Sequence, residues 1–423
     1  MEISWFFIMA CIALGLWGLA LFSALFGPDL EYKLVKPSQD PESPEFLNIL
    51  EAVTDAKIRS HSKATVLTNG ENFYPAQLEA IRNAAHSIHL EAYIFQRGKM
   101  AQQFLDALIE RARAGVEVRL VVDGIGSFST RIAYFRDFCA AGGHFCWYHP
   151  LRWHTLFRMN HRTHRELLII DGKVGFIGGA GVADHWMHKK GKHPRWRDTV
   201  VRVEGEIVAG LQSTFLENWL EGTGEALAGT EYFQAPKATK SQAMVVNSTP
   251  SVGTSSRARM LFQLLLASAK ESIAINSPYF LPDKSLRRAL TNAVQRGVKV
   301  QIVLPGKKSD HTLTRTSSRR LYGDLLTAGV EIYEYMPTMI HAKVLIIDNR
   351  WSVVGSTNFD NRSFGLNDEV NLAACDKALA ARLTEDFAQD IADSKRITYK
   401  EWARRPLWER MQELLGWVVQ RQQ

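Results

Sequence analysis

The feature that most constrains the fold of this chain is an internal repeat. Three landmarks recur at nearly constant spacing: Ser87 with Ser272 at 185 residues, Gly115 with Gly297 at 182, and His164 with His341 at 177. Two unrelated domains would not keep this spacing over three landmarks. The sequence therefore predicts two copies of one domain, for which 423 residues leave enough room.

Within each copy the pattern alternates between strands and helices. An apolar run begins the copies at residues 87–95 and 272–280, a helical pattern follows, and a glycine precedes the β-branched runs at residues 116–122 and 298–304. A glycine that closes a helix before a β-branched run is typical of a helix-to-strand junction. Strands that alternate with helices of about 10 to 15 residues indicate βαβ units on a buried, largely parallel sheet. The predicted fold class is α/β, with two βαβ-rich halves.

The rest of the chain divides around these halves. Residues 46–221 and 257–395 carry the two copies, and residues 222–256, rich in Gly, Ala, Thr and Ser, are predicted to connect them. Residues 396–423 place apolar residues three and four apart, with arginines on the other side. This pattern predicts a C-terminal amphipathic helix that either lies on an anionic membrane or docks onto the core.

The amino-terminal segment has a different character. Residues 3–26 contain no charged residue, and a helix of this length, roughly 36 Å, can cross a hydrocarbon core of ~30 Å. A cleaved signal peptide is the alternative, but it usually has a basic start, and here only Glu2 precedes the run. Because Lys33 and Lys36 follow the run, the positive-inside rule places the body of the protein in the cytoplasm. We expect one transmembrane helix in the inner (plasma) membrane.

Each copy carries one histidine motif. The motifs read His164-Arg165-Glu166 through Asp171, followed by Gly178-Gly179-Ala180-Gly181, and His341-Ala342-Lys343 through Asp348, followed by Gly355-Ser356-Thr357-Asn358. Side chains alternate along a strand, so His341 and Lys343 are expected on one face. An imidazole can attack phosphorus or donate a proton, and an ammonium neutralises a phosphoryl oxygen. Ser356 and Asn358 add donors that are predicted to bind the substrate. Two such motifs predict one shared active site in which one histidine attacks and the other protonates the leaving group.

This doubled His-x-Lys-x4-Asp pattern with its Gly-(Ser/Gly)-x-Asn turn resembles the signature of the phospholipase D superfamily, and its arrangement is similar to that of bacterial cardiolipin synthases. The resemblance runs from about Asn69 to the end of the chain. It implies a bilobed α/β fold and phosphodiester chemistry through a phosphohistidine, without metal or other cofactor. It also implies that His164 is the nucleophile, that His341 is the general acid and later the base, and that Asp198 and Glu369 orient the two imidazoles.

Asp171 and Asp348 are the aspartates of the two motifs, and as motif residues they are grouped with the catalytic residues. They lie seven residues after their histidines, and this odd spacing prevents a shared face on a regular strand. We therefore interpret them as structural residues at strand ends.

The first copy departs from the family pattern at two positions. Glu166 stands where the family has lysine, and Gly181 stands where asparagine usually follows the glycine pair. Three interpretations are open. Another cation, such as Arg162, Arg165 or one of residues 189–192, replaces the lysine; Glu166 transfers a proton or binds the glycerol hydroxyls of an acceptor; or the first copy is degenerate. Both histidines, both orienting carboxylates and the intact second motif favour retained chemistry, with Glu166 in contact with the substrate.

Composition narrows the classes of partner. With 51 Lys plus Arg against 44 Asp plus Glu, the formal charge of +7 favours an anionic partner. Four scattered cysteines without zinc-site spacing argue against a disulfide scaffold. The histidines between residues 185 and 193 alternate with lysines and lack acidic neighbours at helical spacing, so we interpret them as a basic loop rather than a metal site.

The leading hypothesis is a membrane-anchored phosphatidyltransferase that joins two phosphatidylglycerol molecules into cardiolipin and releases glycerol. If water took the place of the second lipid, the same site would be a phospholipase D. A nuclease is a second class, disfavoured by the anchor and by the lack of an aromatic stacking platform, and a non-catalytic binder of anionic lipid is a third. The expected partners are anionic phospholipid and the membrane rather than nucleic acid.

Overall fold

The structure is a computed structural model. It describes residues 40–418, except residue 152 and residues 154–157, 188–194, 235–239 and 251–255, and ten scattered positions before residue 40. The anchor predicted at residues 3–26 lies largely outside the described residues. In the described part of the chain, no helix combines the length and the apolar character that a bilayer crossing requires.

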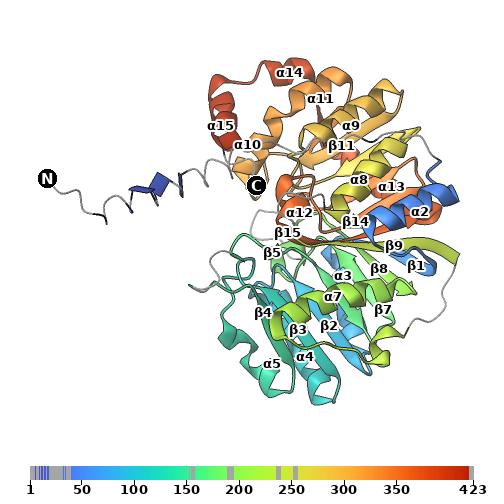
Figure 1. Cartoon of the computed structure of the whole chain (residues 1–423), viewed down its shortest axis with the longest axis vertical. Coiled ribbons are helices and arrows are strands. Elements are labelled where there is room, and N and C mark those ends of the chain that lie inside the picture. Colours follow the sequence, from blue (N-terminus) through green and yellow to red (C-terminus); the bar gives the residue numbers. More distant parts are fainter. Residues whose placement is uncertain are drawn as a thin grey trace.

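The two copies share one continuous sheet of 16 strands. The first copy contributes β1 (Arg59–Thr68), β2 (Ser87–Ala92), β3 (Glu117–Asp123), β4 (His144–Tyr148), β5 (Arg162–Thr163), β6 (Leu167–Ile170), β7 (Val174–Gly178) and β8 (Thr199–Gly205). The second contributes β9 (Lys240–Ser248), β10 (Ser272–Asn276), β11 (Lys299–Pro305), β12 (Glu331–Tyr335), β13 (Val344–Ile347), β14 (Trp351–Gly355), β15 (Asn367–Cys375) and β16 (Ser394–Ile397). The strand order is β16-β12-β11-β10-β13-β14-β15-β9-β1-β8-β7-β6-β2-β3-β4, with β5 paired to β15. Figure 1 shows β9 and β1 side by side where the two copies meet. Apart from β16, the order on one side of the central β9–β1 pair mirrors the order on the other, so the predicted duplication is confirmed.

The sheet is mixed rather than largely parallel, which corrects the prediction. Only β2–β3–β4 and β10–β11–β12, together with the short β5–β15 pair, are parallel. The motif strands β6 and β13 run antiparallel to their neighbours on both sides. The length of the turns after them explains the antiparallel pairing with the next strands, β7 and β14. Residues 171–173 and 348–350 are too few for the crossover that a parallel neighbour needs.

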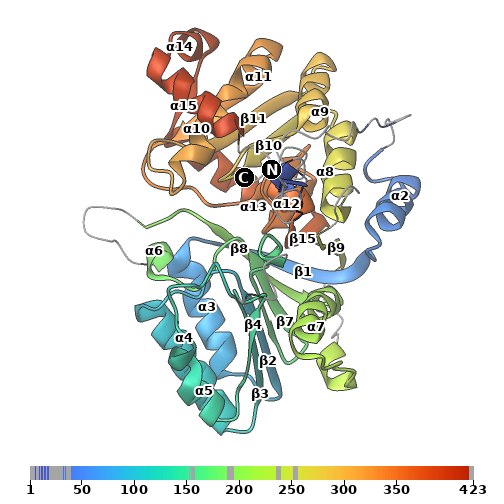
Figure 2. The ribbon, with the colours of Figure 1, turned by 60° about the vertical axis from the view of Figure 1, so that its left-hand side comes forward.

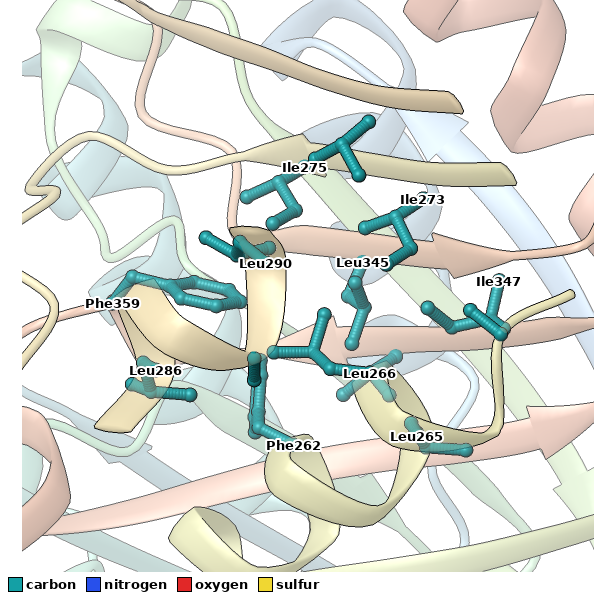
Figure 3. Close-up of a cluster of buried hydrophobic side chains, with 14 of the residues drawn as sticks. Phe262, Leu265, Leu266, Ile273, Ile275, Leu286, Leu290, Leu345, Ile347 and Phe359 are labelled. Carbon is teal, nitrogen blue, oxygen red and sulfur yellow. The ribbon is translucent and has the colours of Figure 1, made fainter. Parts of the chain in front are cut away.

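Helices cover both faces of the sheet (Figure 2). The first copy carries α3 (Gly70–Arg82), α4 (Lys99–Arg113), α5 (Arg136–Ala140), α6 (Asp184–Met187) and α7 (Val208–Thr223). The second carries α8 (Arg257–Ser268), α9 (Lys284–Gln295), α10 (Thr312–Arg320), α11 (Tyr322–Ala328), α12 (Asn361–Gly365) and α13 (Lys377–Ala392). Side chains alternate along β13: Leu345 and Ile347 pack toward α8 and α9 (Figure 3), whereas Val344 and Ile346 join a core that includes residues of α7 and α13. That second core contains residues of both copies.

The predicted helix-to-strand junctions are present in both copies. Gly115 follows α4 with φ +87°, and Gly297 follows α9 with φ +88°. This left-handed conformation costs glycine little and most other residues more, so the glycine lets each helix end and turn directly into the next strand.

Three predicted segment boundaries need correction. Residues 222–256 are not only a connection, because they contain β9, which pairs with β1 and β15 at the centre of the sheet. Helix α2 (Pro44–Thr54) buries Phe46 and Leu50 in the core of the second copy, although residue 46 was predicted to open the first. The tail is not one helix but β16, α14 (Tyr399–Ala403) and α15 (Leu407–Val418), interrupted at Pro406.

Candidate active site

The two motif histidines lie just before strands rather than within them. The strands begin at Leu167 and Val344, so His164, His341 and Lys343 belong to extended segments, which corrects the predicted placement. Each segment is held by the other copy. The backbone N–H of His164 donates to the carbonyl of Asp368 at 2.9 Å, and that of His341 donates to the carbonyl of Arg197 at 2.7 Å. The pseudo-twofold symmetry of the sheet therefore extends to the backbone of the site.

A carboxylate from the opposite copy faces each imidazole. Nδ1 of His164 lies 3.1 Å from both oxygens of Glu369, and Nδ1 of His341 lies 2.9 Å from Oδ2 of Asp198. The tautomer that carries a proton on Nδ1 donates it to the carboxylate and leaves Nε2 for chemistry. The orienting partners implied by the family resemblance are thus arranged crosswise between the copies, and each motif histidine takes its carboxylate from the other copy.

Other side chains fix the two carboxylates in turn. The Ser356 hydroxyl donates to Oε2 of Glu369, and the Trp186 indole donates to Oδ2 of Asp198 at 2.9 Å. Burial alone would raise the pKa of Asp198, but the hydrogen bond and charge of His341 and the charge of Lys343 hold it below its usual value. Burial would also raise the pKa of Glu369, but the charge and hydrogen bond of His164 lower it below its usual value. Both groups are therefore carboxylates that can stabilise an imidazolium.

Lys343 lies beside His341 at the boundary between the copies. Its Nζ is 2.9 Å from each ring nitrogen of His341 and donates to the carbonyl of that residue at 3.0 Å. A Cβ added to Gly179 of the first copy would lie 2.7 Å from Cδ of Lys343, so a larger residue here would force the lysine to move. Burial lowers the pKa of Lys343, and burial together with the Lys343 charge lowers the pKa of His341.

The histidines open into one cavity of about 360 Å³ between the copies. Both copies contribute to its wall: Tyr93, Arg162, His164, Glu166, Gly179 and Trp196 from the first, and Tyr279, Asp310, His341, Asn358, Asp360 and Arg362 from the second. Ser356 lies deeper, where it contacts Glu369. The structure thus brings together His164, His341, their carboxylates, Lys343, Glu166, Ser356 and Asn358.

The motif aspartates lie elsewhere. The carboxylate of Asp171 accepts hydrogen bonds from the backbone N–H groups of residues 85, 86 and 87 at 2.7–3.0 Å, and that of Asp348 does the same with residues 270, 271 and 272 at 2.8–2.9 Å. Each aspartate therefore clamps the turn after its motif strand to the start of the neighbouring strand. Their grouping with the catalytic residues does not fit this geometry, whereas the interpretation as strand-end residues does.

The candidate replacement cations have different positions. Arg165 is fully buried away from the cavity, where it donates to the carbonyl of Thr214 and to Glu217. Arg162 lines the cavity and donates to the carbonyls of His149 and His161. Residues 189–192 lie outside the described residues. Of the candidate cations that the structure describes, Arg162 is therefore the one that could replace the motif lysine at the cavity wall.

Aromatic residues around the histidines were not singled out from the sequence. Trp196 and Trp186 each lie 5.5 Å from the His341 ring, centroid to centroid, and Tyr93 lies 5.1 Å from the His164 ring. His185, part of the predicted basic loop, contacts both tryptophan rings at tilted angles, with centroid distances of 4.1 and 4.0 Å, and burial lowers its pKa to about 4. Among the described residues, no group of three metal-binding side chains converges.

Proteins of known function resemble this chain over most of its length. A family model described as "Cardiolipin synthase, PLD-like domain" matches residues 78–193 and 263–391, one stretch in each copy. A cardiolipin synthase of Staphylococcus epidermidis is 36% identical over 382 residues, which are 89% of this chain and 77% of that protein. The major cardiolipin synthase of Bacillus subtilis is 35% identical over 353 residues, 82% of this chain and 73% of that protein.

Solved structures support the fold alone. The phosphatidylserine synthase of Haemophilus influenzae aligns with a TM-score of 0.68 at 15% identity and covers 89% of this chain and all of that one. The matches in both copies, the length of the aligned relatives and the paired histidines agree: the chain belongs to the cardiolipin synthase family of the phospholipase D superfamily.

Proposed function

We propose that this protein is a phosphatidyltransferase that joins two phosphatidylglycerol molecules into cardiolipin and releases glycerol. The single observation that carries the proposal is the crosswise pairing of His164 with Glu369 and of His341 with Asp198 around one cavity. Two histidines, each oriented by a buried carboxylate, are the groups that a two-step displacement at phosphorus needs.

In the first step Nε2 of His164 attacks the phosphorus of a phosphatidylglycerol, and the bond to the terminal glycerol oxygen breaks. His341 gives its proton to that oxygen, so glycerol leaves as a neutral alcohol. The phosphatidyl group remains on His164, whose positive charge Glu369 stabilises. Lys343 offsets the negative charge that builds up on the phosphoryl oxygens.

In the second step the neutral His341 takes the proton of a glycerol hydroxyl on another phosphatidylglycerol. That oxygen attacks the phosphorus, the bond to His164 breaks, and cardiolipin forms. If water attacked instead, the product would be phosphatidate, so the acceptor alone decides between transfer and hydrolysis.

Exposed apolar side chains near the cavity support the proposed contact with a membrane. Phe128 is 75% exposed, and its backbone N–H donates to the carbonyl of Ile125, which lines the cavity. Leu313 precedes Thr314 of the cavity wall, on helix α10. Helix α15 packs against α10 (Figure 2). It exposes the side chains of Leu407, Trp408 and Met411. Apolar side chains around a headgroup cavity suit a protein whose substrate lies in a bilayer.

The two helices of the tail, α14 and α15, differ in how they contact the rest of the protein. Trp402 of α14 packs against Gly323 and donates to the carbonyl of Arg319, which docks α14 onto the core. Helix α15 keeps the apolar side chains of its first turns exposed. We propose that α14 docks and α15 touches the lipid, with the segment at residues 3–26 as a single-pass anchor in the inner membrane and the catalytic body on the cytoplasmic side.

The test is turnover of phosphatidylglycerol by the purified full-length protein in vesicles, without added metal, with cardiolipin, phosphatidate and glycerol measured together. We expect cardiolipin and glycerol in equal amounts, and neither from His164→Ala or His341→Ala. Phosphatidate as the main product would make the protein a hydrolase, and turnover that survives loss of His164 would contradict the phosphohistidine.

A further inference from the structure

The two departures of the first copy from the family pattern form one coupled arrangement. Oε1 of Glu166 accepts hydrogen bonds from the backbone N–H groups of Tyr93 and Ile94, both at 3.1 Å. A Cβ added to Gly181 would lie 2.8 Å from this same oxygen and 2.5 Å from the carbonyl oxygen of Ile94. The carboxyl group of Glu166 therefore occupies the space that a side chain at position 181 would need.

The second oxygen of Glu166 has a different environment. Glu166 is 7% exposed and contributes to the cavity wall beside His164. Its Oε2 accepts no hydrogen bond from any residue that the structure describes. This oxygen is also not fully buried by protein atoms. Oε2 is thus the oxygen left to face the cavity, where the phosphate diester binds.

The surroundings of Glu166 favour the protonated group. Burial raises its pKa well above the usual range, against the two amide hydrogen bonds and the charge of Lys343. Glu91 on β2 raises the pKa of Glu166 further, and the phenols of Tyr74 and Tyr93 lie nearby. The cavity wall also carries His164, Asp310 and Asp360 and the cations Arg162 and Arg362. An incoming phosphate adds a further negative charge. When Glu166 is protonated, the two amides that donate to Oε1 make it the carbonyl oxygen and leave the proton on Oε2.

We propose that the carboxyl group of Glu166 donates a hydrogen bond from Oε2 to a non-bridging phosphoryl oxygen of the phosphatidyl group. In this role Glu166 takes the position of the motif lysine as a neutral donor, and Lys343 supplies the cation from the second copy. This inference rests on the proposed function, since it assigns a contact to the same substrate phosphate.

The kinetic test compares Glu166→Gln with Glu166→Met in the full-length protein. Glutamine keeps both the acceptor for the amides and a donor toward the cavity, so we expect kcat within about threefold of the wild type. Methionine keeps the volume without the donor, and we expect kcat to fall about tenfold or more, the size of one hydrogen bond to a charged oxygen. A Glu166→Gln protein as slow as Glu166→Met would overturn the proposal.

An infrared measurement separates a donor from a group that only fills space. The wild type should show a protonated-carboxyl C=O band that is missing in Glu166→Gln. This band should shift when sn-glycero-3-phosphoglycerol, the deacylated headgroup, binds. Glu91→Gln, a buried carboxyl that does not line this cavity, is the matched control and should keep the band and its shift. A band that does not respond to the ligand would refute the contact.

The outcomes distinguish this inference from the proposed function. If the wild type forms no cardiolipin, the proposed function fails. If it forms cardiolipin through His164 but Glu166 carries no proton or makes no contact, only the inference fails.

Discussion

The crosswise pairing can be tested by replacing Glu369 with glutamine, which keeps the size of the side chain and removes its charge. Glu369 is fully buried, and both of its oxygens lie 3.1 Å from Nδ1 of His164. The phosphorylated imidazole is positively charged, so the loss of the carboxylate should weaken the intermediate and the transition states on either side of it. The pairing predicts that a change in the second copy slows the step performed by the histidine of the first.

The magnitude follows from this distance. Two unit charges 3.1 Å apart attract by about 5 kcal/mol at an effective dielectric constant near 20, which is an upper limit for the effect. A hydrogen bond to a charged group contributes about 1.5–3 kcal/mol in measured series. At about 1.4 kcal/mol for each factor of ten, we expect formation of the phosphohistidine to slow by roughly 10- to 100-fold.

The assay is a rapid acid quench of the protein with radiolabelled phosphatidylglycerol, which measures the covalent intermediate in a single turnover. Asp368→Asn is the matched control, because Asp368 is the neighbouring buried carboxyl and contacts Tyr148 rather than an imidazole. His164→Ala defines the background. An unchanged rate of labelling in Glu369→Gln, with normal folding, would refute the reasoning.

Three further predictions concern other parts of the molecule. Asp198→Asn removes the group that raises the pKa of His341 against burial, so this pKa should fall. Since His341 must be protonated to donate, the loss of activity with rising pH should move to lower pH in a pH–kcat profile; an unmoved profile would count against this role. Asp171→Asn tolerates the left-handed backbone but weakens three hydrogen bonds, so denaturant unfolding should show a loss of about 1–3 kcal/mol with kcat retained. Phe128→Ser with Ile132→Ser should raise KM for phosphatidylglycerol in vesicles severalfold and leave turnover of a monomeric short-chain phosphatidylglycerol unchanged; equal effects on both substrates would contradict a lipid-facing surface.

The duplication was predictable because it leaves a periodic trace in the sequence. Gly115 and Gly297 marked the helix-to-strand junctions, and the strands that follow them contain apolar runs at residues 120–122 and 302–304. The odd spacing of Asp171 and Asp348 from their histidines also indicated their structural position correctly. Each of these features depends on the spacing and type of residues along the chain, so it can be predicted from the sequence alone.

The features that sequence reasoning missed depend on contacts between distant segments. Strand β9 has only a short apolar run, at residues 243–246, among polar residues, so it was read as part of a connection, although it lies between β1 and β15. The position of the Glu166 carboxyl depends on amides 72 and 73 residues away in the chain and on the absence of a side chain at Gly181. The sequence showed that positions 166 and 181 depart from the family pattern. It could not show that the Glu166 carboxyl lies where a side chain at position 181 would be.

The β1–β9 pair has a consequence for how lipids exchange at the site. The sheet runs without interruption from one copy to the other, so a hinge between them would break this strand ladder and both histidine–carboxylate pairs at once. We therefore expect the halves to stay together throughout the cycle, and glycerol and the second lipid to use the same cavity. The second lipid takes the place that glycerol leaves while the first phosphatidyl group stays on His164, so the kinetics should be ping-pong. Added glycerol should compete with the second lipid for the phosphohistidine and return the first phosphatidylglycerol to the membrane.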